Sequence, residues 1–303
     1  MAFVAVILDR IFGEPDALWD RAPHPTVAMG NLVNWLDEAL NRGGRRIAKG
    51  ILACVVLVIV AGVTARVIAW VPDFGLLEIL GAAVLIAQKS LVEHVRAVAD
   101  ALRQGLPQGR NAVSMIVGRD TGAMTEAEVS RAAIESAAEN FSDGVVAPVF
   151  YFLIFGLPGI VIYKMINTAD SMIGHRTPEY AEFGMAAAKL DDVLNWVPAR
   201  ISAGLIAAAF ASKAALDVAF EDADLHRSPN AGWPEAAMAG ALGVALSGPR
   251  SYSGAKTDDP FVNASGDRDI DENAVDRAVS ALDRSWAAML AVLGVSVALI
   301  WLI

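Results

Sequence analysis

Carboxylates recur at helical spacing between residues 125 and 143. Glu135, Glu139 and Asp143 follow one another at intervals of four residues, and the amide of Asn140 adjoins them. In a persisting helix the first two share one face and Asp143 extends the stripe at its end. Like charges at this spacing disfavour a helix unless something neutralises them, and oxygen ligands suit Mg²⁺. The alternative interpretation is a solvated acidic helix face.

This stripe has a defined helix start. Thr125 and Glu128 form the Thr-x-x-Glu pattern of a capping box, in which each side chain bonds the backbone N–H of the other residue. The pattern predicts a helix that begins at residue 126 and runs through residue 138.

A second polar block follows an apolar stretch. Asn167 and Asp170 lie three residues apart and therefore on one helix face, and Lys164 precedes Asn167 by about one turn. A carboxylate and an amide at the membrane end of a helix are costly unless paired or functional. We expect Lys164 to pair with Asp170 or with a phosphate; an ordinary interfacial helix end is the alternative.

A third block gathers acids and an amide within one helical turn. It contains Asp191, Asp192 and Asn195, and Arg200 follows Pro198. The planar guanidinium fork suits phosphate or carboxylate recognition. Adjacent aspartates are common on protein surfaces, so this block carries little weight alone.

Two proline-rich loops contribute the remaining candidates. Residues 228–235 hold Asn230 and Glu235 in a loop shaped by proline and glycine before a helix. His24 lies between two prolines, where a histidine is more often structural than catalytic. No Walker A loop, GxGxxG or HExxH pattern occurs.

The elements that position these blocks are predicted to be membrane helices. Hydrophobic residues make up 55% of the 303 residues and charged ones 19%, and the apolar residues occur in blocks. Residues 51–71 are long enough to cross the ~30 Å hydrocarbon core. A turn at 71–75 and a second apolar segment, 76–87, complete a helical hairpin. Residues 286–303, with Trp286 and Trp301 near the ends, predict a C-terminal span.

Other apolar segments are shorter or interrupted. Residues 144–166 are broken at 155–159, so each half is too short to span, and we favour a re-entrant hairpin over a kinked span. Residues 201–216 and 236–246 predict buried packing helices, and 247–273 a polar loop. The N-terminus, without a basic region or cleavage site, predicts a retained apolar helix.

Charge sets the expected orientation and excludes one class of partner. The net charge is -10, which gives nucleic-acid binding no electrostatic support. Basic residues at 42–49 place that end of the hairpin in the cytoplasm by the positive-inside rule. The single cysteine, Cys54, excludes an internal disulfide. The fold class is therefore an all-α, polytopic integral membrane protein with polar cytoplasmic loops, which we treat as one domain over residues 1–303.

Taken together, the blocks resemble the adenosylcobinamide-phosphate synthase family of cobalamin biosynthesis, the CobD/CbiB type. The resemblance covers almost the whole chain in the family's order. Phe141 and His175 depart from the family's usual pattern. These departures bear on the exact substrate and not on membership of the family. The segments that carry the resemblance are 13–30, 132–151, 163–176, 183–201 and 228–252.

The resemblance implies an ATP-dependent, Mg²⁺-dependent ligase in the cell (inner) membrane. It implies an amide bond between the propionate carboxylate of adenosylcobyric acid and (R)-1-amino-2-propanol, its O-phosphate or an ethanolamine equivalent. Residue type and motif position then suggest three groups of roles: metal ligands (Glu135, Glu139, Asn140, Asp143, Asp170), substrate- or phosphate-binding residues (Lys164, Asn167, Arg176, Asn195, Arg200, Asn230, Glu235), and proton acceptors (Asp191, Asp192, His24).

Two other classes remain open from the sequence. A Mg²⁺-dependent membrane transferase also places Asp and Asn at helix ends, but its multi-Asp spacings are not reproduced here. A transporter also uses broken helices and membrane carboxylates, but no inverted repeat is visible. The amino alcohol, the acyl intermediate (phosphate or adenylate), and association as a homo-oligomer or with late cobalamin-pathway enzymes also stay open.

Overall fold

The computed structural model describes residues 1–14, 19–21, 23–252 and 255–302, most of them in helices. The chain forms two compact units, each assembled from two separate stretches of sequence. Unit 1 comprises Met1–Ala87 and Asp143–Trp196, and unit 2 comprises Gln88–Ser142 and Val197–Ile303. Each unit is described by itself.

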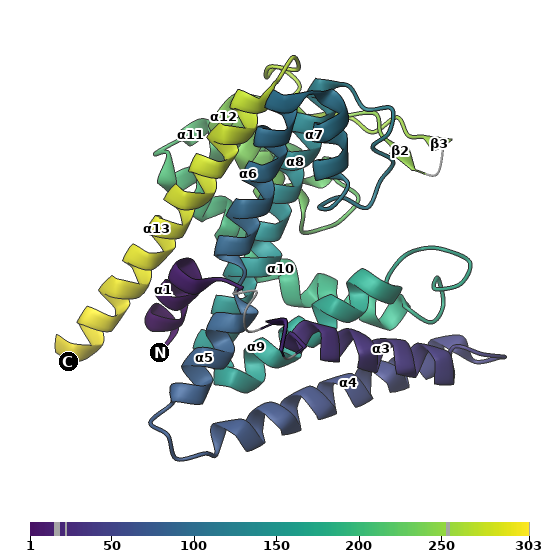
Figure 1. Cartoon of the computed structure of the whole chain (residues 1–303), viewed down its shortest axis with the longest axis vertical. Coiled ribbons are helices and arrows are strands. Elements are labelled where there is room, and N and C mark those ends of the chain that lie inside the picture. The colour runs from purple at the N-terminus through teal and green to yellow at the C-terminus, as the bar shows by residue number, and fades with distance from the viewer. Residues whose placement is uncertain (15–18, 22, 253–254, 303) are drawn as a thin grey trace. The chain divides into compact units, whose positions relative to one another are not determined.

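Unit 1 is a group of helices packed around one central helix. That helix, α9, contacts α1, α3, α4 and α5, and Figure 1 shows α3, α4 and α9 running side by side. The unit also contains the first part of α10. The bounds of its helices are α1 Ala2–Phe12, α3 Pro25–Leu40, α4 Arg46–Ala69, α5 Leu76–Leu85, α9 Ala147–Ile173 and α10 Met185–Ala209.

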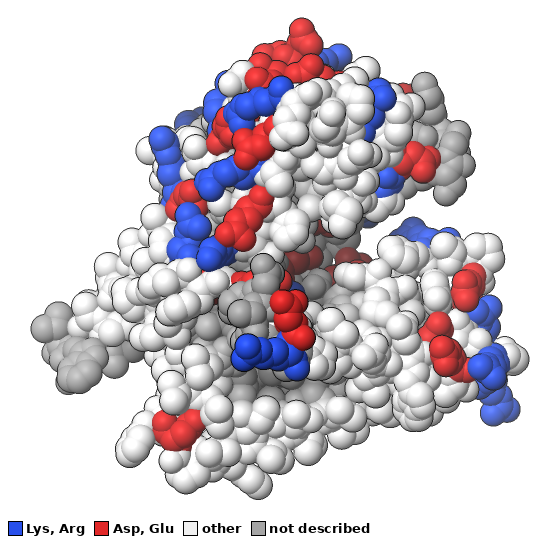
Figure 2. Space-filling view, viewed as in Figure 1, with Lys and Arg blue, Asp and Glu red and all other residues white. Residues whose placement is uncertain are grey.

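The α4–α5 hairpin predicted from the sequence is present. Small residues such as Ala53 and Ala61 are buried, whereas Ile59 and Val63 are exposed, as in a helix with one face towards lipid. Figure 2 shows little charge along α4 except towards the end that carries the basic residues. In the turn, Asp73 accepts hydrogen bonds from the backbone N–H groups of Gly75 and Leu77, at 3.0 and 2.7 Å, and so starts α5.

Helix α9 is broken where the sequence predicts. Gly156 has φ 63° and ψ -153°, a conformation that only glycine adopts without strain, and Pro158 follows it. A Cβ on Gly159 would lie 2.3 Å from the Tyr151 carbonyl oxygen, so the two turns meet without room for a side chain. The interruption is confirmed, and the re-entrant course of the chain stays a prediction.

Unit 2 is built around α8. This helix packs against α6, α7, α12 and α13, and Figure 1 shows α6, α8 and α13 side by side. Its buried alanines allow the close approach. The helices of the unit are α6 Gln88–Gln104, α7 Leu106–Val113, α8 Glu126–Phe141, the rest of α10, α11 Lys213–Asp222, η2 Ala223–Leu225, α12 Gly232–Leu242 and α13 Glu272–Leu302.

The start of α8 is confirmed and its end differs from the prediction. Thr125 and Glu128 form both reciprocal bonds of the capping box. Beyond Phe141 the chain enters a π-helical turn, Ser142–Val146, which adds a residue per turn. Asp143 lies within this turn, so the α-helical register that the sequence predicts for it does not continue there.

Two other predicted elements need correction. Residues 201–216 are not one helix: α10 ends at Ala209, Ala211 has φ 47°, and the Ser212 side chain caps α11. The polar loop at 247–273 contains short antiparallel pairs. Strand β1 (Leu246–Ser247) pairs with β4 (Phe261–Val262), and β2 (Ser251–Tyr252) pairs with β3 (Ala255–Lys256).

Among the described residues, three helical segments are long and apolar enough to cross a membrane. They are Arg46–Ala69, Glu126–Ile173, which joins α8 and α9 through the π-helical turn, and Glu272–Leu299 within α13. The predicted C-terminal span at 286–303 thus forms the end of a longer helix, and its last residue lies outside the described residues. Helix composition therefore supports association with a membrane.

Candidate functional site

A buried hydrogen-bond chain links α9 and α10 in unit 1. Asn195 Nδ2 donates to Asp191 Oδ2 at 2.9 Å, and Asn167 Nδ2 lies 3.3 Å from Asp191 Oδ1. The hydroxyl of the fully buried Tyr163 donates to Asn195 Oδ1 at 2.9 Å and lies 3.1 Å from the Asp143 carbonyl oxygen. The chain fixes the Asp191 carboxylate in one orientation and leaves it only 8% exposed.

The environment of Asp191 favours its neutral form. Burial raises the pKa of this carboxyl from 3.8 to about 7, and the charge of Asp170 adds to the effect, while the hydrogen bonds from Asn167 and Asn195 oppose it. The neighbouring Asp192 also raises it. A group with a pKa close to neutrality accepts and returns protons readily, so Asp191 has the property of a general acid–base.

Several other predicted residues of unit 1 lie near this carboxylate or near its neighbour Asp192. Lys164 lies among the charges of Asp143, Glu14 and Asp191. Burial raises the pKa of Asp192, and the charge of the exposed Arg176 opposes that shift. These residues belong to separate sequence motifs, and the fold brings them together on α9, on α10 and on the segments that adjoin these helices.

His24, a predicted proton acceptor, serves the start of α3. Its Nδ1 accepts a hydrogen bond from the Thr26 backbone N–H at 3.2 Å and lies 2.6 Å from the Thr26 hydroxyl. Its ring meets the edge of Trp19. These contacts describe a helix cap, which is the structural role that the sequence favoured for this histidine.

Glu135, a predicted metal ligand, is held by cations of the protein itself in unit 2. Its Oε2 lies 2.7 Å from Arg119 and 3.1 Å from Arg250, and its Oε1 accepts a hydrogen bond from the Ser247 backbone N–H at 2.6 Å. With both oxygens engaged, the carboxylate orients two arginines. The like-charge cost that suggested a metal is relieved by these guanidinium groups.

Glu235 and His226 form a buried pair in the same unit. Burial raises the pKa of Glu235 well above its ordinary range, and the charges of Glu135 and Glu139 reinforce that shift. Burial lowers the pKa of His226, so burial favours the neutral form of both partners, whose side chains lie 3.6 Å apart. Glu235 Oε2 has no hydrogen-bond partner among the described residues.

Arg200 and Asn230, both predicted to bind substrate, contact each other in unit 2. The guanidinium lies 3.3 Å from the Asn230 side-chain oxygen and 3.4 Å from the Pro229 carbonyl oxygen, and it stacks 4.6 Å above the Trp233 ring. The motif at 228–235 is therefore folded around this arginine.

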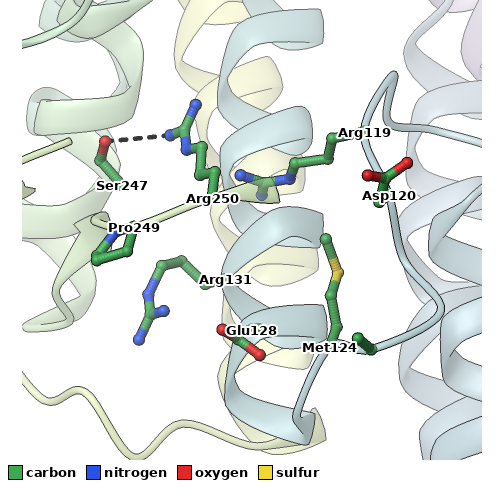
Figure 3. Close-up of a pocket in the computed structure, with 9 residues that line it drawn as sticks. Arg119, Asp120, Met124, Glu128, Arg131, Ser247, Pro249 and Arg250 are labelled. Carbon is green, nitrogen blue, oxygen red and sulfur yellow. Dashed lines mark hydrogen bonds between the residues drawn. The ribbon is translucent and has the colours of Figure 1, made fainter. Parts of the chain in front are cut away.

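Unit 2 also contains a cavity lined by arginines, which the sequence motifs do not predict. Arg119, Arg131 and Arg250 line it, and Figure 3 shows that they come from a loop, from α8 and from the segment after β1. Tyr163, which anchors the unit 1 chain, was missed as well. Among these residues, only Arg131 could have been suggested by the sequence, because it lies on the predicted helix that bears the acidic stripe.

The predicted Mg²⁺ ligands differ in how well they suit a metal. Among the described residues, no group of three or more His, Cys, Asp or Glu side chains is arranged to hold one. Mg²⁺ often needs only one or two protein oxygens beside substrate phosphates. Glu139 and Asn140 are exposed and fit that demand. Asp143 lies near Lys164 and Asp170 near Asp191, and their role as metal ligands stays a prediction.

Comparison with known proteins gives a consistent result over nearly the full length. A family model described as CobD/Cbib protein matches residues 2–282. Cobalamin biosynthesis protein CobD of Rhizobium meliloti (strain 1021) is 52% identical, with 94% of this chain and 90% of the relative aligned. The protein of the same name from Rhodobacter capsulatus is 45% identical, with 99% and 98% aligned. No solved structure matches the chain.

Proposed function

The chain belongs to the CobD/Cbib family, and we propose that it is the membrane ligase that joins adenosylcobyric acid to an amino alcohol in cobalamin biosynthesis. The bond formed is an amide between a propionate carboxylate of the corrinoid and (R)-1-amino-2-propanol, its O-phosphate or an ethanolamine equivalent. The curated relatives are cobalamin biosynthesis proteins, which supports the pathway. The reaction itself is our proposal.

Amide formation from a carboxylate requires two steps. The carboxylate oxygen first attacks ATP and gives an acyl phosphate with ADP, or an acyl adenylate with pyrophosphate. The free amine then attacks the acyl carbon, the C–N bond forms, and phosphate or AMP leaves. At neutral pH the amine arrives as an ammonium, so a protein group must take up a proton before or during the attack.

The observation that carries this proposal is the buried chain Tyr163–Asn195–Asp191–Asn167. The two amides hold both oxygens of Asp191, and the tyrosine holds Asn195. Such fixed orientation is what a general base requires to accept a proton from an ammonium. The pKa of about 7 lets Asp191 take the proton at neutral pH and release it afterwards.

Mg²⁺ supplies charge neutralisation at the ATP phosphates when bound. Glu139 and Asn140 would hold it through their side-chain oxygens, because both residues are exposed at the end of α8. Arg200 and Lys164 are proposed to receive anionic groups of the substrates. The proposed location is the cell membrane, with the apolar helices as multiple spans.

A direct assay tests the proposal. The purified protein is reconstituted into lipid membranes and incubated with adenosylcobyric acid, ATP, Mg²⁺ and each candidate amine. The corrinoids are then analysed by mass spectrometry. We expect a product whose mass equals acid plus amine minus water, and only when ATP is present. An unchanged corrinoid with every amine would reject the ligase function.

A further inference from the structure

Four basic residues, which we call the basic cluster, lie where α4 begins. Arg42 and Arg45 are exposed in the segment that joins α3 to α4, Arg46 is the first residue of α4, and Lys49 follows by about one turn. They belong to unit 1, and Figure 2 shows Lys and Arg side chains, with acidic neighbours, at this end of α4. In a chain whose apolar helices associate with a membrane, such a cluster adjoins the headgroup region.

The basic cluster is held by neutral oxygen atoms. Arg46 Nε donates to the Asn41 side-chain oxygen at 2.8 Å, and its Nη2 donates to the Glu179 backbone carbonyl. Lys49 Nζ donates to the Arg42 carbonyl. Within the part of the chain that the structure describes, none of the four side chains has a nitrogen within 4.0 Å of a carboxylate oxygen. Neutral acceptors thus orient two of the cations without cancelling their charge.

Acidic side chains nearby lower the net charge of this end of unit 1. Asp37 accepts a hydrogen bond from the Asn41 amide at 2.8 Å and one from the Tyr180 hydroxyl at 3.3 Å. The exposed carboxylates of the same region are Glu38, Glu179 and Glu182. A region balanced in this way attracts a freely dissolved anion only weakly, because long-range attraction depends on net charge. A ligand that binds here must therefore gain from contacts other than charge.

An apolar stripe begins at the basic cluster and follows α4. Its members recur every fourth residue, so consecutive members are neighbours on the helix surface. Trp35 of α3, the helix that packs against α4, is 61% exposed within two turns of the same end. Tryptophan prefers the boundary between headgroups and acyl chains. The members of the stripe are aliphatic and 42–56% exposed: Ile47, Ile51, Val55 and Ile59.

We propose that the basic cluster and the apolar stripe together bind an anionic phospholipid of the surrounding bilayer. Its phosphate lies on Arg42 and Arg45, and one acyl chain follows Ile47, Ile51 and Val55. Arginine forks bind phosphate oxygens through several N–H donors, and the acyl chain adds contacts that a dissolved anion lacks. Clusters of Lys and Arg beside a membrane span attract anionic lipids. The inference concerns the lipid and does not depend on the ligase reaction.

Native mass spectrometry measures the binding directly. The purified full chain in detergent is titrated separately with phosphatidylglycerol and with phosphatidylcholine of identical acyl chains, and the dissociation constants follow from the lipid that stays bound. We expect the wild type to bind phosphatidylglycerol more tightly than phosphatidylcholine. In the double variant Arg42→Gln/Arg45→Gln, the dissociation constant for phosphatidylglycerol should rise at least about tenfold, and that for phosphatidylcholine should stay unchanged.

The control removes two arginines elsewhere. Arg103→Gln/Arg227→Gln changes the net charge equally, and both arginines are exposed and paired with carboxylates. We expect this variant to bind both lipids as the wild type does. Glycerol phosphate, which carries the headgroup phosphate without acyl chains, should not displace phosphatidylglycerol. Equal weakening in the control, unchanged binding in the Arg42/Arg45 variant, or displacement by glycerol phosphate would overturn the assignment.

A wild-type measurement guards against misfolded variants. The protein in bilayers is photolabelled with phosphatidylglycerol or phosphatidylcholine that carries a diazirine on an acyl chain, and the labelled peptides are quantified by mass spectrometry. We expect the phosphatidylglycerol probe to label the peptide with Ile51 and Val55 more strongly than the phosphatidylcholine probe does. The two probes should label the exposed Val292 and Val295 of α13 equally. Equal labelling by both probes at both places would refute a site for an anionic lipid.

Discussion

Replacing Asp191 with asparagine should lower the rate of amide formation without lowering the stability of the fold. The substitution preserves the size of the side chain and removes its ability to accept a proton. A positioned general base contributes about 10²–10⁴-fold to a rate. We therefore expect kcat for amide formation to fall by about that factor in Asp191→Asn. The acidic limb of the wild-type pH–rate profile, which reports protonation of Asp191 near pH 7, should disappear.

The same substitution, which lowers kcat, should not lower the free energy of unfolding above pH 7. The pKa of Asp191 is raised from 3.8 to about 7 in the folded protein. Its protonated form is therefore favoured by folding, and the cost of ionising it grows as the pH rises from about 4 to about 7. At ~1.4 kcal/mol per pKa unit, the full cost is about 4 kcal/mol above pH 7. Asparagine carries no charge and avoids this cost.

The expected net gain is smaller, because the asparagine NH₂ must face one of the two amide donors and lose a hydrogen bond worth about 1 kcal/mol. At pH 8 we expect Asp191→Asn to be at least as stable as wild type, by thermal unfolding followed with circular dichroism. The control is Asp217→Asn, which removes an exposed carboxylate paired with Lys213 at 3.0 Å and should change neither property. A variant that kept more than a tenth of the wild-type kcat would refute the role of Asp191.

Three further substitutions test the buried groups. Glu235→Gln should change the free energy of unfolding at pH 7 by less than about 1 kcal/mol, because burial raises the pKa of this carboxyl and favours its neutral form, which an amide resembles. A loss several times larger in urea unfolding would contradict a neutral carboxyl. Glu135→Gln should cost about 3–5 kcal/mol in urea unfolding, since Arg119 loses its buried partner, and a near-neutral effect would contradict the ion-pair assignment. Tyr163→Phe should cost about 1–3 kcal/mol and lower kcat more than it changes KM, whereas unchanged kinetics would mean that the hydroxyl does not position Asn195.

Much of the local structure could be predicted from short-range patterns. The capping box at Thr125 and Glu128 depends only on residues three apart, so the sequence determines it. The break at Gly156 and Pro158 follows from the backbone preferences of those residues. Helix α4 follows from a long aliphatic run.

Other features depend on tertiary contacts that no periodicity contains. The π-helical turn at Ser142–Val146 changes the register of Asp143, and its residues carry no distinct pattern. The end of α10 at Ala209 occurs inside an alanine-rich segment that would continue a helix by propensity alone.

The candidate site also combines residues that local patterns identify with contacts that only the fold reveals. Sequence spacing identified Asp191, Asn167 and Asn195 as polar residues worth explaining, but only the packing of α9 on α10 reveals that both amides hold the same carboxylate. Glu135 was expected to need a cation, and the structure supplies one from Arg119 and Arg250, which lie 16 and 115 positions away. Charge compensation at that separation is invisible to a local pattern.

An isotope measurement tests the central claim, that this chain activates a corrinoid carboxylate for attack by an amine. Adenosylcobyric acid labelled with ¹⁸O in the propionate carboxylate is incubated with the protein, ATP, Mg²⁺ and the amine, and the phosphate and AMP are analysed by mass spectrometry. We predict that one ¹⁸O atom passes to phosphate or to AMP for each amide formed. Amide formation with no ¹⁸O in either product would contradict activation by ATP at the carboxylate.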